Sequence, residues 1–309
     1  MDPRPVREAA LALPVPRQDP TDKAAAFLAA VTATDPDEIM AQLRGAPRAS
    51  IEAEFRRTLA TMRKTASTDA EIKVEVPPGA DPSDWRIEWY RGLRHLAVGE
   101  AADAWHEFAR IRDLLPGEAA PKLALAACAE RLGDPELARH YYRTVWRTCQ
   151  EFTGAAFGIA RTYAAQPGDD GMEDAIETLE SIPVSLRHHV VARITAVRLR
   201  LGRPGLGEQG LRATAKRLLD LDLDEEQRLG LRIEVWQAAR TWLSDGNGPA
   251  GPEPLLDVLL TPAAIGFALE QAYLSLRRYV PGRRERAALV TSAHNARPRT
   301  RWRWSQTAR

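Results

Sequence analysis

The chain has 309 residues, enough for one large domain or two modest ones with a real hydrophobic core. Its formal net charge of +1 gives no general attraction to nucleic acid or to an anionic membrane surface. Its two cysteines exclude a disulfide framework, and no apolar run reaches the roughly 18 residues of a membrane-spanning helix. These features favour a cytoplasmic protein.

The N-terminal quarter predicts two different segments. Residues 1–20 are rich in proline and predict an extended, linker-like N-terminus. Residues 21–84 predict helices near 23–31, 37–44 and 50–64, the last with Ser50 as its N-cap. The stretch "EIKVEVPPGADPSD" then breaks the helical pattern, and its alternating apolar residues have no partner strand. We interpret it as a linker or an excursion that docks on the helices.

Two adjoining segments repeat with an offset of 34 residues, and they are "DWRIEWYRGLRHLAVGEAADAWHEFARIRDLLP" and "AAPKLALAACAERLGDPELARHYYRTVWRTCQ". The matched pairs are Gly92 and Ala126, Gly99 and Gly133, Ala104 and Ala138, and Phe108 and Tyr142. Small residues let two helices approach, and an aromatic four residues later fills the gap on the same face. A third, stretched unit places Gly158, Ala175 and Leu179 at three of these positions.

This pattern predicts an all-α fold, a tetratricopeptide-like helical-repeat (α-solenoid) array over residues 85–300. Its later helices are expected near residues 188–201, 208–220, 225–244, 263–279 and 283–295. Residues 301–309 form a basic tail with Trp302 and Trp304. For that tail, a disordered solvated end is favoured over nucleic-acid binding by phosphate contact and stacking.

Several longer phrases resemble one family, among them "WRIEWYRGL", "LPGEAAPKLALAACAE", "YYRTVWRT" and "ALVTSAHNARPRT". They look like the C-terminal tetratricopeptide-repeat domain of the actinobacterial serine/threonine protein kinase G family, with similarity from about Leu13 to Thr300. The resemblance implies a family architecture of a rubredoxin-like metal module, a kinase domain and this repeat domain. The chain has no VAIK-type lysine, HRD-like loop or DFG, and no CxxC pair. It therefore looks like the repeat domain alone, and residues 50–84 depart from the family's helix pair.

Other candidate sites are better explained by structure than by chemistry. "GLGEQG" at Gly205, Gly207 and Gly210 matches GxGxxG, but a helix is expected before it, so an inter-helix loop is favoured over phosphate binding. Cys128 and Cys149 are read as packing residues rather than a redox pair. The adjacent His188 and His189 point to different sides of a helix, which disfavours a metal site. No catalytic residue, cofactor or metal is predicted.

The repeat pattern also predicts a groove for a protein partner. By analogy with tetratricopeptide domains, the first helix of each unit faces it with Trp89, Leu93, Leu96, Leu123, Ala127, Arg131, Ala155, Ile159 and Thr162. A clamp for a C-terminal carboxylate would need Lys and Asn at the positions that Trp89 and Leu93 occupy. A mostly apolar groove suits an amphipathic or extended segment, such as a kinase linker. The alternative is that these residues only pack on neighbouring helices.

Three functions are compatible with these features. The first is a non-catalytic scaffold, a regulatory or dimerisation module of a Ser/Thr kinase system. Its partners would be a kinase, a kinase substrate or a second copy, with no nucleic acid and no membrane insertion. The second is the detached C-terminal part of a split or truncated kinase whose catalytic domain is on another chain. The third is a small-molecule sensor, which no convergence of polar residues in the sequence supports.

Overall fold

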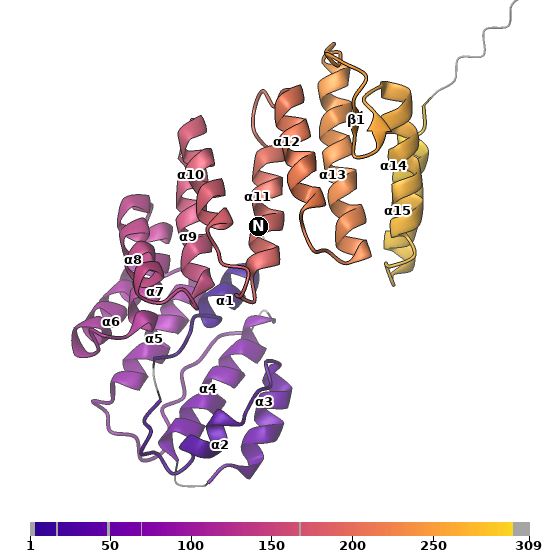
Figure 1. The fold of residues 1–309 in the computed structure, drawn as a ribbon. Coiled ribbons are helices and arrows are strands. Elements are labelled where there is room, and N and C mark those ends of the chain that lie inside the picture. Colours follow the sequence, from indigo (N-terminus) through magenta and orange to yellow (C-terminus); the bar gives the residue numbers. More distant parts are fainter. Residues whose placement is uncertain (1–3, 17, 48–49, 69, 167, 299–309) are drawn as a thin grey trace, which may run out of the picture. The chain divides into compact units, whose positions relative to one another are not determined.

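A computed structural model describes residues 4–16, 18–47, 50–68, 70–166 and 168–298. In this part of the chain all regular structure is helical apart from one two-stranded sheet. Figure 1 shows the order of these helices along the chain. The chain divides into two compact units, Met1–Tyr163 and Ala164–Arg309, which we call the N-terminal and C-terminal units.

The N-terminal unit begins with a helix where extended backbone was expected. Helix α1 spans Arg4–Leu11, so the prediction of an extended segment over residues 1–20 is wrong for these eight residues. The sequence "REAAL" has high helix propensity, and Pro5 stands in the first turn, where no intrahelical N–H is needed. The apolar end of α1 is buried, Ala10 at 2% and Leu11 at 0% exposure, so packing stabilises this short helix.

Three helices follow, and two of them have side-chain N-caps. They are α2 (Ala25–Ala29), α3 (Pro36–Gln42), continued by the short 3-10 helix η1 (Leu43–Gly45), and α4 (Ile51–Ala66). Ser50 Oγ accepts a hydrogen bond of 3.0 Å from the backbone N–H of Ala53, so the predicted N-cap of α4 is confirmed. Asp35 caps α3 in the same way, through Asp37 and Glu38.

The irregular segment after α4 forms no strand among its described residues and docks on the helices. Ile72 is 1% exposed and belongs to the same core cluster as Phe55 and Leu59 of α4. Thr58 Oγ1 also lies 3.2 Å from the carbonyl oxygen of Glu75, to which it can donate. The segment therefore covers part of α4 as an excursion.

The repeats appear with the predicted spacing. Helices α5 (Trp85–Val98) and α6 (Ala101–Leu114) form the first pair, and α7 (Ala119–Arg131) and α8 (Pro135–Thr148) the second, each beginning 34 residues after its counterpart. Helix α9 (Thr153–Ala164) begins a further 34 residues after α7. Gly99 ends α5 at φ 90°, a left-handed conformation in which a residue with a Cβ is strained.

The C-terminal unit continues with helices. They are α10 (Asp169–Glu180), α11 (His189–Leu201), α12 (Glu208–Leu219), α13 (Glu225–Ser244), α14 (Pro262–Leu276) and α15 (Arg283–Ala296). All five helices predicted from residue 188 onward are present, and α14 ends three residues before its predicted end. The unit has its own core, which includes Leu211, Val235 and Leu269.

A small hairpin between α13 and α14 was not predicted. Strands β1 (Pro254–Leu255) and β2 (Val258–Leu259) pair antiparallel. The two turn residues, Leu256 and Asp257, have φ of 50° and 68°, a conformation that usually takes Asn or Gly. Arg232 Nη2 donates to the carbonyl oxygen of Leu256 at 2.9 Å, so side chains of α13 hold a turn that its own sequence does not favour.

Candidate partner groove

The nine residues predicted to face the groove lie on α5, α7 and α9, the first helices of the three repeats. In the structure, Ala127 is half-buried, Arg131 is exposed and the other seven are buried. Their contacts differ from helix to helix.

On α5, Trp89 packs within its own repeat. Its ring centroid lies 5.0 Å from that of Phe108 on α6, and its exposure is 0%. The indole Nε1 is buried without a hydrogen-bond partner among the described residues. Trp89 therefore fills the space between α5 and α6.

The other two positions on α5 lie beside the N-terminal helix. Leu93 and Leu96 are fully buried in one core cluster with Ala10 and Leu11 of α1. Helix α1 packs along both α4 and α5. Arg63 of α4 fixes its end by donating from Nε to the carbonyl oxygen of Leu11 at 2.9 Å. A segment of this chain thus already covers the α5 end of the predicted groove.

Beyond that end a cavity of about 660 Å³ remains. Four of the nine predicted residues line it, namely Leu96, Leu123, Ala127 and Arg131. Leu13 and Pro14, which follow α1, also line the cavity. The apolar part of its surface comes from Leu123 and Ala127 on α7 and from this N-terminal segment.

A polar network lines the same cavity. Arg161 of α9 donates to both carboxylate oxygens of Glu130, from Nε at 2.9 Å and from Nη2 at 3.0 Å. Tyr142 Oη donates to Glu130 Oε2 at 2.9 Å. Burial, followed by the nearby Glu130 carboxylate, raises the pKa of Tyr142, so its hydroxyl stays a donor. Because these donors already bind the Glu130 carboxylate, a partner in this cavity would contact mainly apolar side chains.

The predicted positions on α9 do not line this cavity. Ala155 and Ile159 belong to a core cluster with Leu123 of α7. Thr162 accepts hydrogen bonds from Arg139 at its side-chain and carbonyl oxygens, at 3.3 and 3.2 Å. Helix α9 lines the cavity instead with Gly154 and Arg161, one residue before Ala155 and Thr162. Neither residue was predicted, because the third unit is stretched and its sequence defines the rotation of α9 only to within about one position.

The other candidate residues from the sequence lie in a loop and on helices. Gly205 and Gly207 lie in the loop between α11 and α12, with no strand before them in the described chain, and Gly210 is inside α12. His189 Nδ1 lies 2.8 Å from the carbonyl oxygen of Ile182. The basic tail of residues 301–309 lies outside the described residues. Among the described residues, no helix is both long and apolar enough to cross a bilayer.

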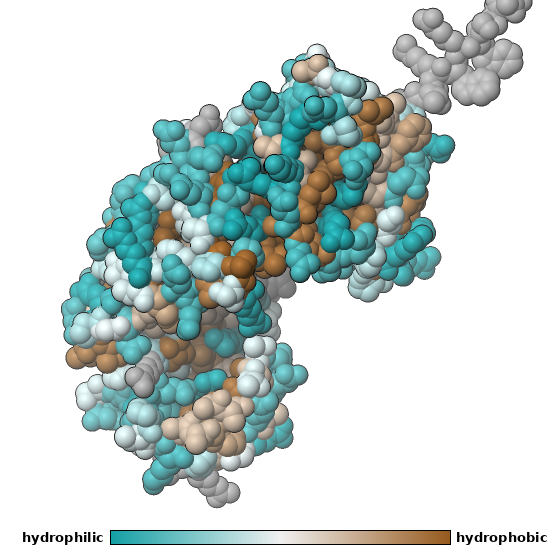
Figure 2. All heavy atoms as spheres, in the orientation of Figure 1, coloured by the Kyte–Doolittle hydropathy of each residue, from teal (hydrophilic) through white to brown (hydrophobic). Residues whose placement is uncertain are grey.

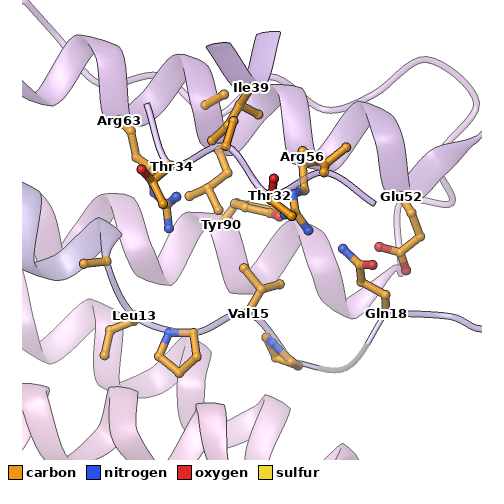
Figure 3. A pocket seen from close by; sticks show the side chains of 17 residues that line it. Leu13, Val15, Gln18, Thr32, Thr34, Ile39, Glu52, Arg56, Arg63 and Tyr90 are labelled. Atoms are coloured by element: carbon orange, nitrogen blue, oxygen red, sulfur yellow. The ribbon is translucent and has the colours of Figure 1, made fainter. Parts of the chain in front are cut away.

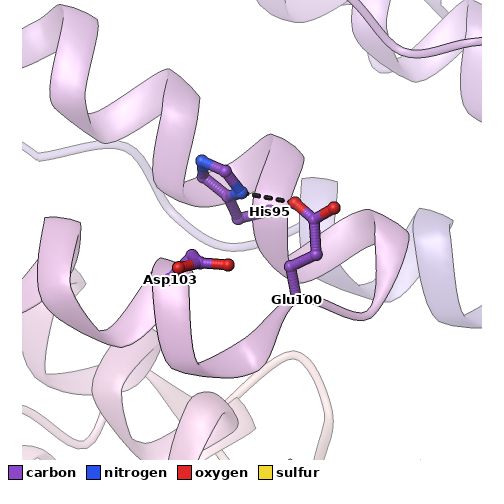
Figure 4. Close-up of side chains that lie close together, drawn as sticks. All are labelled: His95, Glu100 and Asp103. Atoms are coloured by element: carbon purple, nitrogen blue, oxygen red, sulfur yellow. Dashed lines mark hydrogen bonds and ion pairs between the residues drawn. The ribbon is translucent and has the colours of Figure 1, made fainter.

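A group of potential metal ligands lies at the turn between α5 and α6. His95, Glu100 and Asp103 bring one ligand atom each within 4.8 Å of one another (Figure 4). His95 Nδ1 is 2.5 Å from Glu100 Oε2, and Arg94 Nη1 is 3.4 Å from each of these two atoms. A guanidinium already takes up part of the negative charge here, and the two carboxylates are exposed, so the group is explained as a surface ion-pair network.

Apolar surface is present on the C-terminal unit as well. On the face drawn in Figure 2, its brown apolar side chains lie between teal polar ones. Phe267 on α14 and Val290 on α15 are 46% and 40% exposed. Single exposed apolar residues of this kind are common on protein surfaces and do not define a site.

Comparison with known proteins identifies the family. A family model described as protein kinase G tetratricopeptide repeat matches residues 4–300. The chain is 35% identical over 301 residues to serine/threonine-protein kinase PknG of Mycobacterium leprae (strain TN), covering 93% of this chain and 39% of that protein. It is 33% identical over 306 residues to the protein of that name from Mycolicibacterium smegmatis, and this match covers 94% of this chain and 40% of that protein. The chain thus spans about two fifths of the length of these relatives, and the predicted family and helical-repeat fold are confirmed.

Proposed function

The chain belongs to the protein kinase G tetratricopeptide-repeat family, and on that basis we propose that it is a protein-interaction scaffold serving a Ser/Thr kinase system as a regulatory or dimerisation module. The matching family model describes a repeat region, which supports a non-catalytic role. We include a cytoplasmic location in the proposal, because both cysteines are free and a reducing compartment suits free thiols.

The cavity beside α5, α7 and α9 is the observation that carries this proposal. Its apolar lining includes Leu123 and Ala127, and Leu13 of the N-terminal segment borders it. Helix α1 and the residues after it show the kind of segment that this face accepts, an apolar helix end followed by extended chain. A partner segment of the same character would extend the contact into the cavity by the helix-in-groove mode.

The test is affinity purification from the native cell, followed by mass spectrometry, with the full chain as bait. Ala127→Arg places a long cation in the cavity, and it should abolish capture of a kinase or kinase substrate. Ala102→Arg is the matched control, because Ala102 is an exposed residue of α6 that does not line this cavity. Recovery of no stable partner, or equal recovery with both variants, would contradict the proposal.

A second candidate function follows from the length of the match. The chain aligns with only 39–40% of relatives that are named as kinases. This supports a role as the C-terminal part of a Ser/Thr kinase that acts on the catalytic domain. Co-expression with the kinase domain of such a relative should change that domain's phosphotransfer rate or thermal stability, and no change in either would contradict this version.

A further inference from the structure

A second cavity, of about 520 Å³, lies in the N-terminal unit outside the repeat groove. It is enclosed by the chain after α1, the loop between α2 and α3, and helices α4 and α5 (Figure 3). Leu13, Val15, Ile39 and Leu59 supply apolar walls. Its volume is within the roughly 300–1,000 Å³ of small-molecule sites.

Two arginines of α4 line this cavity. Arg56 and Arg63 are seven residues apart, two helical turns, so they share one face of the helix. Both are half-buried. Arg56 makes no hydrogen bond or ion pair with any described residue, and Arg63 uses only Nε, for the carbonyl oxygen of Leu11. Burial lowers the pKa of Arg63, and the charge of Arg56 acts in the same direction. The cavity thus holds two guanidinium groups without a counter-charge.

The acidic residue of the lining is already engaged. Glu52 Oε1 accepts from Arg86 Nη1 at 2.6 Å and from the backbone N–H of Asp19 at 3.0 Å. Glu52 is 6% exposed, so these bonds compensate its burial. Its carboxylate is held by Arg86 and does not neutralise Arg56 or Arg63.

Tyr90 adds a third donor between the two arginines (Figure 3). Its ring stacks on Phe55 with centroids 5.3 Å apart and planes 8° from parallel, which fixes its position. The hydroxyl has no hydrogen-bond partner among the described residues. Burial raises the pKa of Tyr90, so the hydroxyl keeps its proton and can donate.

We infer that this cavity binds a small organic monocarboxylate, with the carboxylate between Arg56, Arg63 and Tyr90 and the organic body against the apolar walls. Guanidinium groups match carboxylates with paired, charge-assisted hydrogen bonds. Both guanidinium groups have donors that no described residue uses, and these donors are available to an anion in the cavity. Arg56 and Arg63 together carry a formal charge of +2, and a carboxylate placed between them offsets part of it.

This inference goes beyond the proposed function and does not depend on it. The two cavities share Leu13 and Pro14 of the N-terminal segment, but Arg56 lines only the first and Ala127 only the second. Variants at Arg56 and Ala127 therefore test anion binding and partner capture separately.

The test is calorimetric titration of the full chain with pentanoate, which carries one carboxylate on a short apolar body. Pentanamide has the same body without the charge, and inorganic phosphate has charge without the body. Saturable one-site binding of pentanoate, no binding of pentanamide and weaker binding of phosphate are expected. No saturable binding of pentanoate, or tighter binding of phosphate, would overturn the assignment.

Variants locate the site. Arg56→Gln and Arg63→Gln should each weaken pentanoate binding by about tenfold or more, since each removes charged hydrogen bonds. Tyr90→Phe keeps the stacked ring and should weaken it by about threefold. Lys64→Gln removes a cation of α4 outside the cavity, and it should leave affinity within about twofold. Arg56 makes no hydrogen bond or ion pair with the described residues, so its variant tests the site even if Arg63→Gln does not fold. Equal affinity in Arg56→Gln and Lys64→Gln would overturn the inference.

Discussion

Tyr142 of α8 lies directly against Gly158 of α9, so closely that a Cβ at position 158 would be 2.5 Å from the tyrosine ring. The ring cannot swing aside freely, because it is 4% exposed and its hydroxyl is bonded to Glu130. Gly158→Ala should therefore destabilise the fold by about 1–3 kcal/mol through overpacking, despite the helix propensity of alanine. Urea denaturation followed by circular dichroism measures this loss.

The same helix offers a matched control. Gly154 has no atom within 4 Å of its would-be Cβ and is exposed. Gly154→Ala should gain about 0.4–1 kcal/mol, because alanine loses less backbone entropy than glycine. If Gly158→Ala were as stabilising as Gly154→Ala, the close contact between α8 and α9 would not exist in solution.

The repeated part of the fold could be predicted because local pattern and packing agree there. The pairing of a small residue with an aromatic is visible in sequence, and the structure places Phe108 on Gly92 just as it places Tyr142 on Gly158. These contacts differ in one respect that sequence does not reveal. Phe108 contacts the glycine of its own repeat, whereas Tyr142 contacts that of the next one.

The sites could not be predicted in the same way, because they depend on tertiary neighbours. Residues 1–20 suggest a linker because they contain five prolines, but Pro5 is the one proline within α1. Packing on α4 and α5 stabilises the helix-favouring sequence that follows Pro5. The seven-residue spacing of Arg56 and Arg63 was a visible signal of a shared face. Nothing in the sequence indicated that Tyr90 would join them, or that no carboxylate would pair with them.

Leu11, at the end of α1, tests whether this helix is an integral part of the N-terminal unit. Its side chain is fully buried in the core cluster that contains Leu93 and Leu96. Leu11→Ala should cost about 2–5 kcal/mol, the usual range for a buried leucine. Chemical denaturation provides the value. Leu114→Ala serves as the comparison, because Leu114 is 63% exposed and its loss should change stability by no more than about 0.5 kcal/mol. Equal effects would show that α1 is detached in solution.

Glu180, at the end of α10, forms ion pairs that we expect to stabilise the fold in a pH-dependent way. Burial opposes its charge, but hydrogen bonds and attraction from Arg200 and Arg217 outweigh burial and lower its pKa below the ordinary 4.5. Arg200 is 7% exposed and donates to Glu180 at 2.7 Å. Glu180→Gln should cost about 1.5–3 kcal/mol near neutral pH, since it removes charged hydrogen bonds from a buried arginine.

The sign of the pH effect follows from the lowered pKa of Glu180. The carboxylate's contribution is complete above the ordinary pKa, and it disappears as pH falls through the lower folded-state pKa. The stability difference between wild type and Glu180→Gln should therefore be constant from neutral pH to about pH 5 and shrink below that. Glu177→Gln, an exposed change on the same helix, should show neither the loss nor the pH dependence. A difference that grew on acidification would contradict the assignment.

The burial of Cys128 predicts that its thiol does not react in the folded protein. It is fully buried in α7, and burial raises its pKa to about 12, so almost no thiolate exists near pH 8. Cys149 is only half-buried. A thiol reagent such as DTNB should therefore label one cysteine per native chain and both after denaturation, and Cys149→Ser should remove the native reaction. Rapid native labelling of Cys128 would show that α7, the central helix of the proposed groove, opens readily, since the reagent reaches this thiol only when its packing is broken.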